Sequence, residues 1–66
     1  MPLINTTKGL VEESTLARTV GFEDRPAEFV IWVEWRIGAE LVRRDAHVVL
    51  KEPSVVADAL AAAIGG

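Results

Sequence analysis

A β-hairpin pattern over residues 28–50 constrains the fold of this chain more than any other feature. Two runs of strand-forming residues, EFVIWVEWRI and ELVRRDAHVVL, flank Gly38-Ala39, and a two-residue hairpin loop favours glycine at a central position. Side chains alternate between the two faces of a strand. One face of the first run, the odd face, carries Phe29, Ile31, Val33, Trp35 and Ile37. The other face carries Glu28, Val30, Trp32, Glu34 and Arg36. The apolar odd face is therefore expected to form the core.

A two-residue loop predicts the register of this hairpin, with Ile37 opposite Glu40. In that register Glu34 faces Arg43 as an ion pair, and such a cross-strand pair contributes roughly 0.2–1 kcal/mol. The other predicted pairs are Trp35 with Val42, Val33 with Arg44, Ile31 with Ala46, Phe29 with Val48, Trp32 with Asp45, and Val30 with His47.

A third strand precedes the hairpin. Residues 15–23 alternate between large apolar and small side chains, and the sequence DRPA at 24–27 is typical of a turn, because proline restricts both itself and the residue before it. A loop of four residues would place Phe22 opposite Phe29.

A helix is predicted over residues 53–64. The segment begins with proline, which is favoured in a first helical turn, and it is rich in alanine. Val56, Leu60 and Ile64 follow one another at a spacing of four, which predicts one apolar stripe. Gly65-Gly66 ends the pattern.

These elements predict one small α+β domain over residues 1–66. A three-stranded antiparallel β-meander occupies residues 15–51, and the C-terminal α-helix packs on one of its faces. Residues 1–14 are expected to form an N-terminal extended arm or an edge strand.

The predicted register places Arg18 and Arg44 on the apolar face, beside Val33. An unpaired buried charge costs several kcal/mol, so both guanidinium groups need a partner or a route to solvent. Asp58 on the helix is the expected partner. The alternatives are the arm residues 12–13, a neighbouring subunit, or extension of the arginines to the rim.

Composition narrows the function classes. A net charge of −3 and a pI of 4.9 argue against a non-specific nucleic-acid partner. The chain has no cysteine and one histidine, so no metal site or cofactor is expected. Neither a signal-peptide pattern nor an apolar run of membrane-spanning length is present. The expected location is the cytoplasm, or a particle assembled there, without a membrane partner.

Trp32 is the first candidate binding residue. The predicted register surrounds it with Val30, Thr19, Asp45 and His47 on the mixed face of the sheet. Exposed tryptophan and arginine side chains dominate protein interfaces. Trp32 is either a contact with a partner or the residue over which the N-terminal arm folds, and the sequence leaves both readings open.

Asp45 and His47 share one strand face, where a carboxylate can orient an imidazole for general-base chemistry. No nucleophile accompanies them in the sequence, so a half-exposed strand histidine is the simpler interpretation.

The opening residues Met1-Pro2-Leu3-Ile4 resemble the start of the small tautomerases, in which the amino-terminal proline acts as general base. The resemblance covers these four residues only, and it implies a catalytic role for Pro2 alone. The family's long helix after its first strand and its early arginine have no counterpart here.

The sequence therefore predicts a non-enzymatic interaction or assembly module that self-associates, of a type that suits a minor structural component of a phage-like particle. The alternatives are a small oligomeric tautomerase-like enzyme that uses Pro2 and a regulatory module that binds a strand of another protein.

Overall fold

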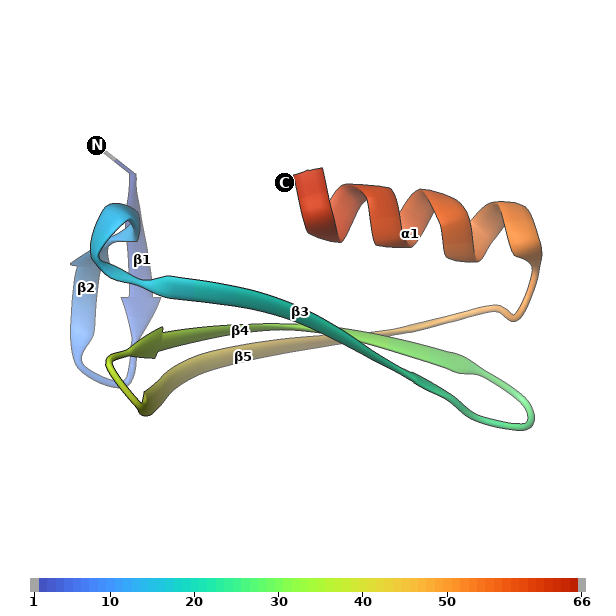
Figure 1. Cartoon of the computed structure of the whole chain (residues 1–66), viewed down its shortest axis with the longest axis horizontal. Helices are drawn as coiled ribbons and strands as arrows, with labels where there is room; N and C mark the ends of the chain where they lie inside the picture. The colour runs from blue at the N-terminus through green and yellow to red at the C-terminus, as the bar shows by residue number, and fades with distance from the viewer. Residues whose placement is uncertain (1, 66) are drawn as a thin grey trace.

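The computed structural model describes residues 2–65, and it contains a three-stranded antiparallel sheet, a separate two-stranded sheet and one C-terminal helix (Figure 1). The elements are β1 (Leu3–Thr6), β2 (Gly9–Glu12), the 3-10 turn η1 (Glu13–Thr15), β3 (Ala17–Asp24), β4 (Phe29–Ile37), β5 (Glu40–Val49) and α1 (Pro53–Gly65). The larger sheet has the order β3-β4-β5. The predicted α+β class, the β-meander and the C-terminal helix are confirmed.

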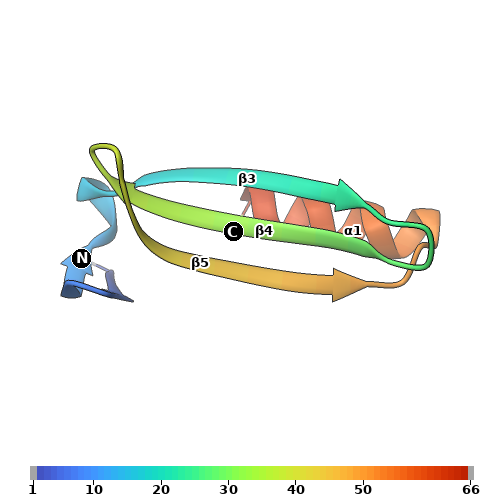
Figure 2. The same ribbon diagram turned by 90° about the horizontal axis from the view of Figure 1, so that it is seen from below.

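The helix covers one face of the larger sheet only. In Figure 1, α1 lies above the sheet, and the β1–β2 hairpin stands on the same side at the other end. Seen from below in Figure 2, the three strands lie in front of α1, and no described segment lies over them. We call the two sides of this sheet the helix face and the uncovered face.

The core is small and lies almost entirely on the central strand. Five buried residues come from β4 and one from β5: Phe29, Val30, Ile31, Val33, Trp35 and Val42. No residue of α1 is fully buried. The radius of gyration is 13.2 Å, whereas a compact domain of this length has about 11 Å. The fold is therefore open, and its helix lies over the sheet without a thick core beneath it.

A β-bulge in β5 overturns the predicted register of the second hairpin. Arg36 pairs with Leu41, but Trp35 pairs with Arg43, which leaves Val42 as an extra residue between them. Two residues of the bulged strand then oppose one of its partner. Val42 is 1% exposed and packs with Val33 and Trp35. Burial of this side chain at the end of the core is the physical reason for the bulge.

Every later residue of β5 is thereby shifted by one position and lies on the opposite face from that predicted, because side chains alternate along a strand. The observed pairs are Glu34 with Arg44, Val33 with Asp45, Trp32 with Ala46, Ile31 with His47, Val30 with Val48, and Phe29 with Val49.

The shift resolves the problem of the buried arginines. Arg44 lies on the uncovered face, where its Nε is 3.9 Å from Glu34 Oε2, so the predicted Glu34–Arg43 pair is wrong. Arg43 lies on the helix face instead, where it bonds to Asp45 and its guanidinium carbon is 5.4 Å from the Trp35 ring centroid.

Arg18 does lie on the helix face, but its partner is not the predicted one. It donates to the carbonyl of Ala63, one of the last carbonyls of α1, which have no partner within the helix. Among residues 2–65, no ion pair joins Asp58 to Arg18 or Arg44. Asp58 is exposed to water, so the prediction that it pairs with these arginines is wrong.

The first hairpin is two residues out of the predicted register, since Phe22 pairs with Ile31 and not with Phe29. An even shift leaves every side chain on its predicted face. The two phenylalanines still stack across the strands, with ring centroids 5.3 Å apart. At the turn, hydrogen bonds from Arg25 to Glu23 and then to Glu28 raise the pKa of Arg25.

The N-terminal segment is a hairpin of its own, in which Leu3 pairs with Glu12 and Thr6 with Gly9. Its loop is fastened to β5 at the bulge, where the Thr7 N–H donates to the Val42 carbonyl over 3.0 Å. This bond and the bulge lie together, so the N-terminal hairpin is held at one end of the sheet.

The helix runs over Pro53–Gly65 and confirms the predicted range. Its half-buried side includes Val56, Leu60 and Ala63, but Ile64 is 67% exposed. The predicted stripe is therefore wrong at its last member. Within residues 2–65, no helix is long and apolar enough to cross a membrane.

Replacing Ile31 with alanine tests how much this thin core contributes to stability. Ile31 is 2% exposed, and removing a buried isoleucine side chain costs about 2–5 kcal/mol. A chain of this length has a free energy of unfolding of about 3–10 kcal/mol, so Ile31→Ala is expected to unfold a large fraction of the protein. Urea unfolding followed by circular dichroism measures the loss.

Ile64→Ala is the matched control, because it makes the same change at an exposed site of α1. We expect it to alter the free energy of unfolding by less than about 0.5 kcal/mol. Equal losses in the two variants would contradict the observed packing of the helix.

Candidate functional site

The structure divides the predicted binding cluster between the two faces of the sheet. Trp32, Val30 and Thr19 share the uncovered face, as predicted, since the strand positions 30 and 32 alternate with Ile31, Val33 and Trp35, and Thr19 pairs with Glu34. Asp45 and His47 lie on the helix face, because the bulge at Val42 reverses them. The residue that replaces them beside Trp32 is Arg44, which the sequence analysis placed on the other side.

The indole of Trp32 packs against Gly21, its neighbour on β3. A Cβ atom added to Gly21 would stand 2.4 Å from Trp32 Nε1 and 2.7 Å from Trp32 Cε2. No side chain fits in that space. Glycine at this position is therefore explained by the close approach of an aromatic ring, and not by a turn or an unusual backbone angle.

Arg44 covers the outer side of the indole. Its guanidinium carbon is 4.9 Å from the Trp32 ring centroid, a distance at which a cation over an aromatic ring gains about 0.5–1 kcal/mol at an exposed site. Glu34 lies within reach of Arg44 at 3.9 Å and of Arg36 at 3.4 Å. We call Gly21, Trp32, Arg44 and Glu34 the Trp32 stack.

The surface around the Trp32 stack is mixed in character. Val30 is buried at 6% exposure, whereas Val48, which pairs with it, is 61% exposed. Thr19 and Ala46 are also exposed. The possibility that the N-terminal segment folds over Trp32 is wrong for residues 2–14, because the β1–β2 hairpin stands on the helix side (Figure 1).

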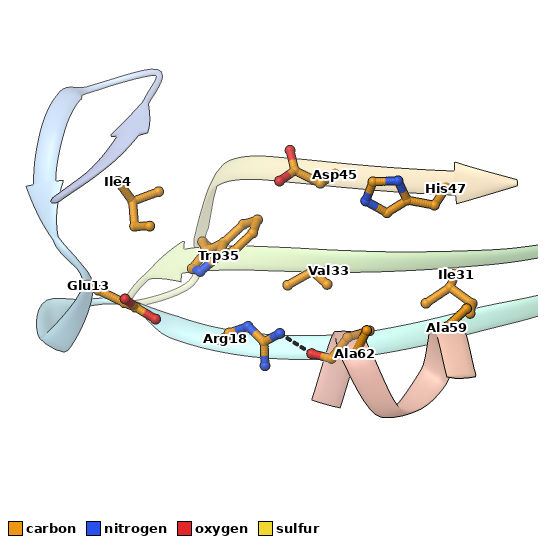
Figure 3. Close-up of a pocket in the computed structure, with 11 residues that line it drawn as sticks. Ile4, Glu13, Arg18, Ile31, Val33, Trp35, Asp45, His47, Ala59 and Ala62 are labelled. Atoms are coloured by element: carbon orange, nitrogen blue, oxygen red, sulfur yellow. Dashed lines mark hydrogen bonds between the residues drawn. The ribbon is translucent and has the colours of Figure 1, made fainter. Parts of the chain in front are cut away.

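A cavity of about 480 Å³ lies on the helix face, between α1, the sheet and the N-terminal hairpin. Figure 3 shows Asp45 and His47 on β5 at one side of the cavity, and Arg18 on β3 at the other side, where it bonds to the helix. Trp35 also lines it, and its buried Nε1 has no acceptor among the described residues.

The side chains that line the cavity lack the arrangement expected of a catalytic centre. Asp45 and His47 share a face, as predicted, but the Asp45 carboxylate is engaged by Arg43 through bonds of 3.1 Å and 3.3 Å. The residues that line the cavity include no serine, threonine or cysteine. The acid–base pair therefore has no nucleophile beside it.

Pro2, the candidate from the tautomerase resemblance, is exposed and does not line this cavity. Its carbonyl accepts a hydrogen bond of 3.1 Å from the backbone N–H of Glu13. This bond joins the two ends of the N-terminal hairpin and gives Pro2 a structural contact.

Within residues 2–65, no group of three or more histidine, cysteine or acidic side chains is arranged to hold a metal ion. The chain matches no protein-family model, no curated protein and no solved structure with which it was compared.

Arg44 was not predicted as a member of the site, because the bulge that brings it to the uncovered face was not predicted. A weak signal was the pair Arg43-Arg44, directly after Val42, because strict alternation places Arg44 on the core side. The bulge places Arg43 there instead, within reach of Asp45 and Trp35.

Gly21→Ala tests the close approach of Trp32. The added methyl group displaces the indole, so we expect a loss of about 1–3 kcal/mol in the free energy of unfolding, the usual cost of overpacking. Chemical denaturation of the purified variant measures it.

The control is the same change in a Trp32→Ala background, where the methyl group has room. There Gly21→Ala is expected to cost nothing, or to stabilise the strand by up to about 1 kcal/mol through the unfolded state. A loss that is the same in both backgrounds would refute the contact.

Proposed function

We propose that this protein is a non-enzymatic interaction module that self-associates, and that the uncovered face around Trp32 takes part in the contact. The observation that carries the proposal is the Trp32 stack on a sheet face that no described segment covers. Tryptophan and arginine are the side chains most enriched among the residues that dominate binding energy.

The thin core supports this proposal. A domain below about 70–80 residues rarely obtains enough stability from one core alone, and oligomerisation is a common remedy. Large apolar side chains remain open to water in every part of the chain. They are Leu3, Leu10, Phe22, Ile37, Leu41, Val48, Leu50 and Ile64. Association removes such surface from water at about 25 cal/mol per Å².

The charges of the uncovered face support self-association over binding of a strongly charged partner. Glu34 lies between Arg36 and Arg44, so both signs are present within one small area. A surface of this kind can be complementary to itself across a twofold axis. The dispersed charge is also a poor match for a polyanion.

Light scattering over a dilution series tests the proposal. The full chain is expected to form a dimer or larger species that dissociates on dilution. Trp32→Ala should weaken this association by about tenfold or more, since truncating a central interface tryptophan typically costs 2 kcal/mol or more.

Leu10→Ala is the control, because Leu10 is strongly exposed, at 68%, and belongs to the N-terminal hairpin. It should leave the dissociation constant unchanged. A well-folded monomer at every concentration would refute self-association and would direct attention to a strand or surface of a foreign protein.

A further inference from the structure

The geometry points to the strand by which two copies join. This inference rests on the proposed self-association and adds its place and register. We propose that the free edge of β3 pairs antiparallel with β3 of a second copy, with Gly21 opposite Gly21 of that copy. The two three-stranded sheets then form one six-stranded sheet with both helices on the same side.

The outer edge of β3 has unpaired backbone groups. β3 has β4 as its single neighbour in the sheet, and Figure 2 shows no described segment beside its other edge. The Arg25 N–H donates to the Glu28 carbonyl at the turn. Because bonded and non-bonded pairs alternate in an antiparallel ladder, odd residues of β3 bond to β4, and the N–H and C=O groups of even residues point outward.

The other edge of the sheet is better protected against pairing. β5 carries the bulge at Val42, and the N-terminal hairpin bonds to it there through Thr7. Bulges, covering segments and charged side chains are the usual devices that prevent edge pairing. β3 has no bulge, no proline and no lysine along its eight residues, and its three charged side chains, Arg18, Glu23 and Asp24, are of both signs. Of the two edges, that of β3 is the one open to a second copy.

The sequence of β3 is complementary to itself in one register. With Gly21 opposite Gly21, Val20 faces Phe22 of the second copy, and Arg18 faces Asp24. Phe22 is 61% exposed in the single chain, and the pairing covers it with an apolar neighbour. Each contact occurs twice, because the twofold axis repeats it.

The charged groups remain available for this pairing. Asp24 bonds to Lys51 at 2.8 Å, yet its side chain is 60% exposed. Arg18 uses one amino group for the carbonyl of Ala63, and a guanidinium has five N–H donors. Of the two registers shifted by two residues, one places Arg18 opposite Phe22 and Leu16 opposite Asp24. The other places Val20 opposite Asp24, so each of them pairs charge with apolar surface.

This register also brings the two Trp32 stacks together. Directly opposite residues in a non-hydrogen-bonded pair have Cα atoms about 4.5 Å apart. Each indole lies over its own Gly21, so the two rings meet above the twofold axis on the uncovered face. Trp32 is thereby placed at the centre of the contact.

Cysteine pairs test the register, since the natural chain has no cysteine. In the proposed dimer Thr19 faces Glu23 of the second copy as a non-hydrogen-bonded pair, at a distance that a disulfide can bridge. Within one chain these positions are about 13 Å apart and cannot bridge. The variant Thr19→Cys/Glu23→Cys, oxidised with glutathione, is expected to run mainly as a covalent dimer on a non-reducing gel.

Ala17→Cys/Glu23→Cys is the matched control. In the proposed register positions 17 and 23 are diagonal neighbours, about 7–8 Å apart, so cross-linking should be at least tenfold slower. Equal or faster cross-linking of this control would overturn the register. No cross-linking in either variant, while the unmodified chain self-associates in light scattering, would overturn the edge contact and leave the proposed function standing.

A second variant tests the edge without cysteine. Phe22→Lys places a lysine on the open edge, and it is expected to raise the dissociation constant at least tenfold while circular dichroism shows a folded chain. An unchanged dissociation constant would contradict the pairing of Phe22 with Val20. A chain that is monomeric without any substitution would refute the proposed function together with this inference.

Discussion

The rest of the structure depends on the burial of Val42 at the bulge in β5. This side chain closes one end of the core against Val33 and Trp35, and the extra residue turns the remainder of β5 over. Arg44 is thereby moved to the uncovered face, and Asp45 is moved to the helix face beside Arg43. The backbone carbonyl of Val42 also accepts the hydrogen bond from Thr7 of the N-terminal hairpin. One packed valine therefore decides the register, the faces of three charged side chains and the position of residues 3–12.

The second constraint is that a single helix covers a single face. A three-stranded sheet needs both faces shielded or made polar, and this one has an uncovered face that carries a tryptophan. The chain shields that ring partly by itself, with glycine beneath it and arginine above it. Such a stack lowers the exposure of the indole without removing it from the surface. A face of this kind is tolerable in a monomer and well suited to a contact, which connects the architecture to the proposed self-association.

Part of the candidate site could be predicted from the sequence. Alternation along residues 29–37 correctly separated Trp32 and Val30 from the core side of β4, since period-two patterning reports faces directly. Asp45, His47 and Arg44 were placed on the wrong faces, because a one-residue insertion in the ladder has no reliable local signal. The expected Asp58 contact failed for a different reason. A helix carbonyl is an acceptor that no side-chain pattern reveals, and Arg18 bonds to one near the end of α1.

For residues 15–65 the sequence by itself determined the element types, their order and the limits of the helix, because periodicity, glycine, proline and alanine content act locally. The strand pair and the 3-10 turn within residues 3–15 were not predicted. It also determined that no disulfide could stabilise the fold. The tertiary structure alone decided the register of β5, the side on which the N-terminal hairpin stands and the pairing of each arginine. These features depend on which side chains compete for a few buried positions at the end of a thin core. That competition is settled by packing over distances of many residues, which no short stretch of sequence encodes.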